Sequence, residues 1–259
     1  MDELTGLHWA ILLLGSAIMG LSKGGIPGAG NLTVALYVLV LEDALGPAGV
    51  AISVGLLLPV LISADLASTI VYRKHVEWKH LRRLLPFFAV GVIAGWWAFD
   101  FFQPPERSRA LKVLIGTILL SMTAMRILSQ LPRVHSHFNS SRLATLMGPL
   151  LGLLGGMATM LANAAGPIAQ FYLLAMKLPK YAFIGTSAWL FLIVNISKVP
   201  LMYELDILDM EVFRTAVWLF FPAIFGALVA PRIVRYIRQD WFEKMIWFFI
   251  VTAGLRMIM

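Results

Sequence analysis

The sequence contains no cysteine and has little charge. None of its 259 residues is Cys, which excludes disulfides, thiolate metal sites and cysteine nucleophiles. Only 14% of the residues are charged, 59% are hydrophobic, and the mean hydropathy is +0.82. A soluble domain typically carries about 25% charged residues, so this chain has too few charges to cover a surface that faces water.

The apolar residues come in long runs, at 9–19, 111–125 and 218–230. In hydrocarbon only helices and closed barrels satisfy their own backbone hydrogen bonds. Barrel strands alternate polar and apolar residues, and these runs do not alternate. The sequence therefore predicts an all-α, polytopic membrane protein whose main surroundings are the lipid bilayer.

The formal net charge of +7 raises the question of a nucleic-acid partner. The basic residues, however, lie in short loops between apolar segments, where the positive-inside rule expects them. We therefore predict no nucleic-acid partner. A Walker P-loop pattern is absent, which disfavours a self-contained ATP pump, and His135 and His137 have no further ligands nearby in sequence for a metal site. We expect no metal and no cofactor.

Ten apolar segments separate into two sets of five. The first set covers 7–22, 31–41, 48–71, 84–102 and 110–128, and the second covers 143–161, 167–176, 183–202, 213–229 and 241–257. Residues of like kind recur in the same order in both sets. The aligned pairs are Tyr37 with Tyr172, Ser53 with Ser187, Ser63 with Ser197, Arg83 with Arg214 and Arg126 with Arg256. The pattern predicts two membrane repeats, 1–129 and 143–259, joined by a cytoplasmic linker at 130–142.

Loop charges predict that the two repeats are inverted. The loop at 72–83 holds five Lys or Arg residues and one acid, whereas the corresponding loop at 203–212 holds four acids and no base. Equivalent loops of opposite charge belong on opposite faces of the membrane, which places both termini outside the cytoplasm. The loop at 103–109 conflicts with this model, because Arg107, Arg109 and the nearby Lys112 fall on the predicted outer face.

Two of the segments are too short to cross a bilayer. Segment 31–41 spans roughly 17 Å as a helix, against about 30 Å of hydrocarbon, and segment 167–176 is similar. Each follows a run rich in Gly or Pro, at 20–31 and 155–167. Short, interrupted segments at matching positions of two halves are the best sequence pointer to a transporter's binding site. The sequence leaves open whether the two segments that flank each break fully span the membrane or form a re-entrant hairpin.

The chemistry of the breaks favours an anion. An unwound stretch before a half-helix presents free N–H groups and the positive end of a helix dipole, and Lys23 adds a full positive charge within the first break. The alternative is that Gly20, Gly24 and Gly28 serve only close helix packing and that Lys23 snorkels to the interface. The predicted substrate-binding residues are Lys23, Gly24, Gly25, Gly28, Gly30, Asn31, Asn163, Gly166, Thr186, Ser187, Asn195 and Lys198.

Two charged residues within apolar segments have open roles. Asp65 is the only acid well inside an apolar segment. It is a candidate proton carrier, which makes H+ the expected coupling ion, or it pairs with Arg73 or Lys74. Lys198 has a substrate or gating role, or it snorkels from the outer end of its segment.

These residues resemble the TauE/SafE family of sulfite and organosulfonate exporters. The resemblance is carried by Ser22–Gly30, by Gly155–Met157 with Asn163–Pro167, by Phe183–Trp189 with Asn195–Pro200, and by Asp65 with Tyr72–His75 and Trp78. It covers nearly the whole chain. It implies export of sulfite, small sulfonates such as sulfoacetate or carboxylates across a bacterial inner membrane, driven by an ion gradient, with no catalysis.

Two other functions fit less well. A channel-like or cation-linked permease of the same fold predicts breaks lined by acids rather than by Lys23. An intramembrane enzyme needs several His, Asp, Glu or Ser groups clustered at one depth, and only Asp65 meets that condition clearly. The sequence does not set the substrate, the direction of transport or the oligomeric state.

Overall fold

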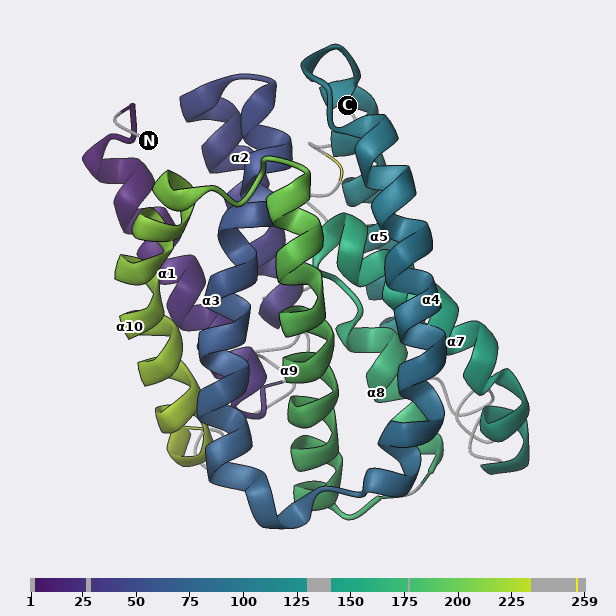
Figure 1. Ribbon diagram of the computed structural model, residues 1–259. Helices are drawn as coiled ribbons and strands as arrows, with labels where there is room; N and C mark the ends of the chain where they lie inside the picture. Colours follow the sequence, from purple (N-terminus) through teal and green to yellow (C-terminus); the bar gives the residue numbers. More distant parts are fainter. Residues whose placement is uncertain (1–2, 27–28, 130–140, 177, 234–254, 256–259) are drawn as a thin grey trace.

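The computed structural model describes residues 3–26, 29–129, 141–176, 178–233 and 255. All regular structure in these residues is helical, as predicted, and they contain no strand (Figure 1). The α-helices are α1 (Gly6–Lys23), α2 (Ala29–Leu45), α3 (Ala48–Tyr72), α4 (Trp78–Phe102), α5 (Ser108–Ser129), α7 (Ser141–Ala162), α8 (Gly166–Ala175), α9 (Lys180–Glu204) and α10 (Met210–Ile233). Short 3-10 helices, Arg73–His75 and Pro105–Arg107, follow α3 and α4.

Helices α1, α3, α4, α9 and α10 are long and apolar enough to cross a membrane. Many of their large apolar side chains face outward. On α10, Trp218, Phe221 and Phe225 are each about two-thirds exposed. Apolar surface of this extent is unusual on a soluble monomer and suits contact with lipid tails. The chain is therefore a multi-pass membrane protein, which confirms the prediction from composition.

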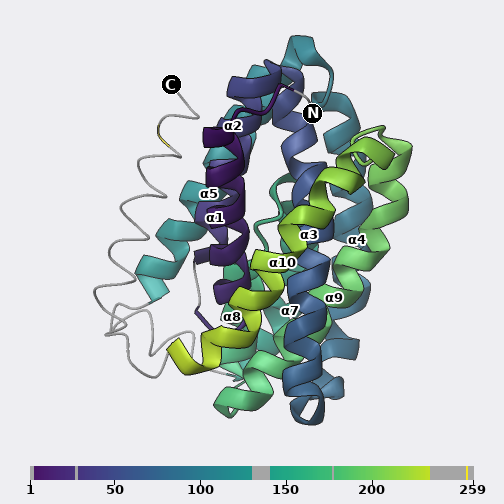
Figure 2. The same ribbon diagram turned by 90° about the vertical axis from the view of Figure 1, so that its left-hand side faces the viewer.

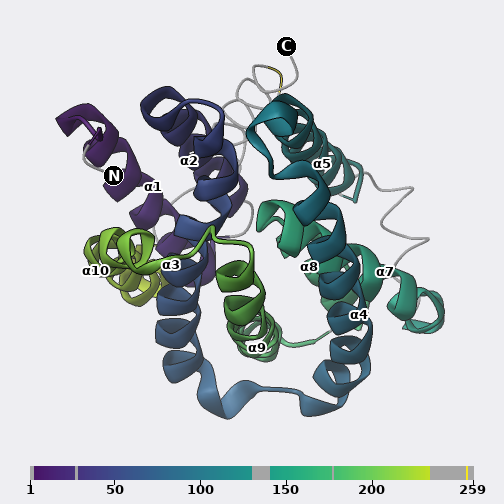
Figure 3. The ribbon, with the colours of Figure 1, turned by 45° about the horizontal axis from the view of Figure 1, so that its top comes forward.

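Helices α3 and α9 pack against each other at the centre of the bundle. Figure 3 shows them between one group formed by α1, α2 and α10 and a second group formed by α4, α5, α7 and α8. α3 is the most deeply buried of the candidate spans. Buried side chains on these two helices therefore face protein rather than lipid, and their polar groups are satisfied by their own helix, as for Ser63, or by a neighbouring element, as for Lys198.

The observed helices match most of the predicted segments, with two clear differences. α8 has ten residues, roughly 15 Å of helix, as predicted. α2 has 17 residues, roughly 26 Å, so it is longer than the predicted segment 31–41, yet it is not among the helices long and apolar enough to cross a membrane. It continues through Glu42 and Asp43 because both acids find partners, Lys112 at 2.7 Å and His8 at 3.0 Å. α4 begins at Trp78 rather than at residue 84, and segment 241–257 lies outside the described residues.

The α3–α4 and α9–α10 connections lie at opposite ends of the molecule (Figure 1). The described N-terminal residues lie at the end that holds the α9–α10 connection, as Figure 2 also shows. The pair between Lys112 and Glu42 resolves part of the charge conflict at the α4–α5 connection, because the acid neutralises the lysine. Arg107 donates to the Phe101 carbonyl at 2.7 Å, so it too is held locally.

Glycines allow two helix pairs to approach closely. α1 packs on α10, where a Cβ on Gly20 would collide with the Ala223 carbonyl and one on Gly24 with the Ala227 carbonyl. α7 packs on α4, where a Cβ on Gly156 would collide with the Phe88 carbonyl. Close packing through small residues is therefore confirmed for these glycines. Each pair joins one helix from each predicted half.

Candidate functional site

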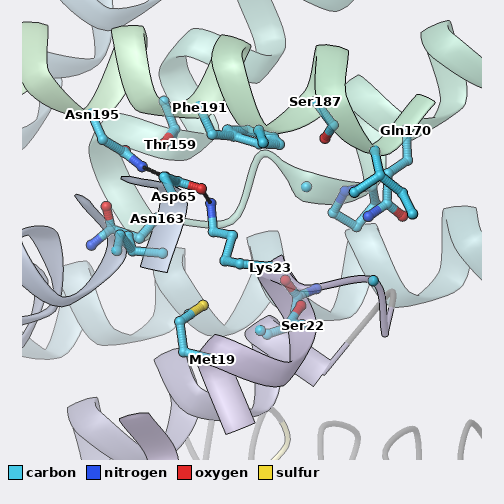
Figure 4. A pocket seen from close by; sticks show the side chains of 18 of the residues that line it. Met19, Ser22, Lys23, Asp65, Thr159, Asn163, Gln170, Ser187, Phe191 and Asn195 are labelled. Atoms are coloured by element: carbon cyan, nitrogen blue, oxygen red, sulfur yellow. Dashed lines mark hydrogen bonds and ion pairs between the residues drawn. The ribbon is translucent and has the colours of Figure 1, made fainter. Parts of the chain in front are cut away.

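A cavity of about 100 Å³ lies between the two helix breaks, α3 and α9 (Figure 4). We call it the central cavity. Its polar wall consists of Ser22, Lys23, Asn31, Asp65, Thr159, Asn163, Gln170, Ser187 and Asn195. Since a single water needs only about 10–15 Å³, the cavity has room for one small ion with a few waters.

The first break separates α1 from α2. α1 ends at Lys23, and Gly25 follows with a φ of +130°, a conformation that glycine adopts without steric cost. The Ile26 N–H bonds back to the Leu21 carbonyl at 3.0 Å, which satisfies part of the helix end. Because the chain turns here, Ser22 and Lys23 in the last turn of α1 reach the cavity wall.

The second break separates α7 from α8 and is centred on Asn163. Its φ is +51°, in the left-handed region that Asn tolerates better than most residues. Its side-chain amide donates to the Val54 carbonyl of α3 at 3.0 Å, which anchors the break against the central helix. α8 then begins at Gly166 with Pro167 in its first turn, and both residues line the cavity.

Lys23 and Asp65 form an ion pair in the cavity wall (Figure 4). The Lys23 Nζ lies 2.8 Å from the Asp65 Oδ1 and 4.3 Å from the centroid of the Phe191 ring, which is a cation–π distance. The Asn195 Nδ2 donates to the Asp65 Oδ2 at 2.8 Å. The fully buried carboxylate therefore has a partner for each oxygen, one from the first break and one from α9.

Lys198, on α9, is also fully buried. Its Nζ donates to the Thr159 carbonyl at 2.8 Å and to the Asn163 Oδ1 at 2.6 Å. The Thr159 hydroxyl and the Asn195 Oδ1 lie at 3.3 Å. All four acceptors are neutral. Lys198 does not itself line the cavity, but Thr159, Asn163 and Asn195 do.

We call these six connected residues the polar cluster: Lys23, Asp65, Thr159, Asn163, Asn195 and Lys198. It holds two lysines but one carboxylate, and Asp65 is the only buried acid among the residues that the structure describes. With the three side chains ionised, the cluster carries one net positive charge. Charges act over longer distances in a low-dielectric interior than in water, so this ionised form of the cluster would favour an anion over a cation in the adjacent cavity.

Most of the predicted site residues lie in the cavity wall. They are Lys23, Gly25, Gly30, Asn31, Asn163, Gly166, Ser187 and Asn195, together with the proton-carrier candidate Asp65. Gly24 and Thr186 do not line it. Gly24 packs against α10, and the Thr186 hydroxyl accepts from the Glu77 N–H at 2.9 Å, which ties α9 to the α3–α4 connection. Gly28 lies outside the described residues.

Two alternatives from the sequence are wrong. Asp65 does not pair with Arg73 or Lys74, because those residues lie beyond the end of α3 in an exposed 3-10 helix, whereas the end of α1 brings Lys23 beside Asp65. Lys198 does not snorkel, because acceptors from the second break surround its Nζ inside the bundle.

Several wall residues were not among those predicted. Ser22 precedes Lys23, Thr159 lies one helical turn before Asn163, and Gln170 lies one turn after Gly166, so helical spacing from the breaks was a usable signal. No such signal marks Phe191, whose ring lies beside the Lys23 ammonium. An aromatic residue in an apolar segment is ordinarily expected to pack against its neighbours.

Within the described ranges, no group of three or more His, Asp or Glu side chains could hold a metal ion. A model of the family described as "Sulfite exporter TauE/SafE" matches residues 12–257. This range includes both breaks and every residue of the polar cluster. No match to the chain was found among curated proteins or among solved structures.

Proposed function

The chain belongs to the TauE/SafE sulfite exporter family, and we propose that it is a secondary transporter that exports sulfite, small organosulfonates such as sulfoacetate, or small carboxylates. The observation that carries this proposal is the excess of lysine over carboxylate in the polar cluster beside the central cavity. Two lysines, the partly buried Lys23 and the fully buried Lys198, lie in this cluster with a single carboxylate, which pairs with Lys23. A cation-linked permease would need the opposite balance of charge in the wall.

The proposed anion site combines Lys23 with the two helix breaks. Lys23 contributes the positive charge, and the N-terminal residues Gly30 and Asn31 of α2 and Gly166 of α8 reach the same cavity. Free N–H groups at a helix start and the dipole of that helix favour an anionic group. Ser187 and Asn195 of α9 complete the wall with neutral polar groups, which suit sulfonate or carboxylate oxygens.

We propose that the central cavity opens alternately to the two sides of the membrane, and that this alternating access depends on two inverted halves of the chain, 1–129 and 143–259. Support comes from the crossed pairing of α1 with α10 and of α7 with α4, and from the placement of the α3–α4 and α9–α10 connections at opposite ends. Rocking of one half against the other around a fixed central site is the usual route in such folds. The linker at 130–142 is then cytoplasmic.

We propose an orientation of the chain in a bacterial inner membrane from the positive-inside rule. The end with the α3–α4 connection carries Arg73, Lys74 and Lys79 and belongs in the cytoplasm, whereas the end with Asp206 and Asp209 belongs outside. Both termini are then extracytoplasmic. H+ is the proposed coupling ion, with Asp65 as its carrier, because Asp65 is a buried acid in the wall of the substrate cavity.

A binding screen on the purified protein tests the proposal. Thermal shift is measured with sulfite, sulfoacetate, taurine, acetate and phosphate, and with sodium and potassium chloride at matched ionic strength. We expect stabilisation by at least one sulfur-containing anion that grows with its concentration, since a ligand that binds the folded state raises its stability. Stabilisation that follows the identity of the cation instead would contradict an anion transporter.

A further inference from the structure

Two charged side chains, Lys23 and Asp65, would be in direct contact with an anion bound in the central cavity. Both line the wall, and their charged atoms are 2.8 Å apart. The lysine ammonium is therefore already neutralised by a carboxylate of the protein itself. The other cluster lysine, Lys198, is fully buried outside the wall. Among the described wall residues, the one lysine or arginine is Lys23, which already pairs with Asp65. A substrate anion can therefore bind this cation only by replacing the Asp65 carboxylate.

An anion that bound beside an ionised Asp65 would place two negative charges within a cavity of about 100 Å³. Like charges at such short range repel strongly where water is scarce. The Asp65 side chain is also fully buried. If it lost Lys23 while ionised, its carboxylate would be an uncompensated charge in a low-dielectric interior, which carries a large free-energy penalty. Protonation removes both costs.

We propose that Asp65 and the substrate anion compete for Lys23, and that the carboxylate takes up one proton from water as the anion replaces it. This inference rests on the proposed anion site. One negative charge leaves the lysine and one arrives, while the proton neutralises the charge that left. The polar cluster and the bound anion together thus keep one net positive charge, and each monovalent anionic group that binds Lys23 brings one proton with it.

The surroundings of Asp65 allow this exchange. Lys23 from the first break and Lys198 from α9 are the charged groups that act on it, and Asn195 donates to its Oδ2 at 2.8 Å. α2, α5 and α10 also lie around α3, but their charged residues are near the helix ends: Glu42, Asp43, Arg109, Lys112, Arg126, Glu211, Arg214 and Arg232. No other described acid is buried beside Lys23 to replace Asp65 as the competitor.

Calorimetric titration of the purified full chain with sulfoacetate tests the exchange. Titrations in two buffers of different ionisation enthalpy count the protons taken up, between pH 6 and 8, where the sulfonate keeps its charge. We expect about one proton per anion, and an affinity that falls about tenfold for each unit rise in pH, because one proton is linked to binding. Asp65→Asn should bind sulfoacetate at least as tightly as wild type at pH 8, without proton uptake or pH dependence.

Asp100→Asn is the matched control, since Asp100 is an exposed acid at the far end of α4, and it should behave as wild type. Binding by wild type with no proton uptake and no pH dependence would overturn the exchange while leaving the anion site intact. Proton uptake that persists in folded Asp65→Asn would also overturn it, because another group would carry the proton. Absence of binding by sulfoacetate and by every anion of the screen would overturn the proposed function, and the exchange with it.

Discussion

The Lys198 ammonium lies 2.6 Å from the amide oxygen of Asn163, the residue at which α7 breaks. The same Asn163 side chain donates to Val54 on α3, so one amide joins the second break to both central helices. The first break reaches α3 in a comparable way, through Lys23 and Asp65. Movement of either break would therefore disturb a polar contact in the middle of the bundle.

The first prediction concerns Lys23. A hydrogen bond that involves a charged group contributes about 1.5–3 kcal/mol, and about 1.4 kcal/mol corresponds to a tenfold change in affinity. Lys23→Ala should therefore weaken sulfoacetate binding by roughly 10- to 150-fold. Lys23→Arg keeps the charge but not the compact ammonium, so a partial loss is expected. Calorimetric titration measures both, after size exclusion has verified the fold. Unchanged affinity in folded Lys23→Ala would place the site elsewhere.

The second prediction concerns Lys198, which we expect to act on the anion through its charge and not by contact. Lys198→Met removes the excess positive charge of the polar cluster, so sulfoacetate affinity should fall by roughly tenfold or more even though residue 198 does not line the cavity. Ser197→Ala is the control. Ser197 is exposed, and its hydroxyl bonds the Val194 carbonyl of its own helix. Equal affinities of the two variants would show that the charge of Lys198 plays no part.

The third prediction concerns the close helix pairs. Gly20→Ala and Gly156→Ala each place a methyl group on the backbone carbonyl of a neighbouring helix, at Ala223 and Phe88. Backbone gives way less readily than a side chain, so each should lose about 1–3 kcal/mol of stability and unfold at a lower temperature in detergent. Gly6→Ala serves as the control, since nothing lies within 4 Å of its added Cβ. A melting temperature for Gly20→Ala or Gly156→Ala equal to that of the control would count against close packing.

The fourth prediction concerns orientation. The natural chain has no cysteine, so single cysteines can be introduced without a background. Lys79→Cys and Glu204→Cys are suitable, because both positions are exposed and lie near opposite connections. In intact cells an impermeant thiol reagent should label residue 204 but not residue 79, which should react only after permeabilisation. Labelling of both from one side would be incompatible with the inverted arrangement.

The sequence alone was sufficient for the features that depend on local composition. Long apolar runs identify membrane helices because hydrocarbon imposes the same demand on every residue of a span. The two breaks, the short α8 and the place of Lys23 in the first break were also readable, since Gly and Pro act on the backbone within a few residues of themselves. Part of the cavity wall lies in these breaks, and the rest comes mainly from α3 and α9.

Only the tertiary structure decided which side chains the buried and charged residues contact. Asp65 pairs with Lys23 and not with Arg73 or Lys74, which are nearer in sequence. α2 continues past residue 41, where Lys112 forms an ion pair with Glu42 and the His8 imidazole forms a hydrogen bond with Asp43. Lys198 is buried because the second break supplies its acceptors. Each contact joins residues far apart along the chain, and its energy exists only once packing has excluded water and brought the two groups within reach. Hydropathy and local spacing describe neighbours in sequence, and so they do not specify such pairs.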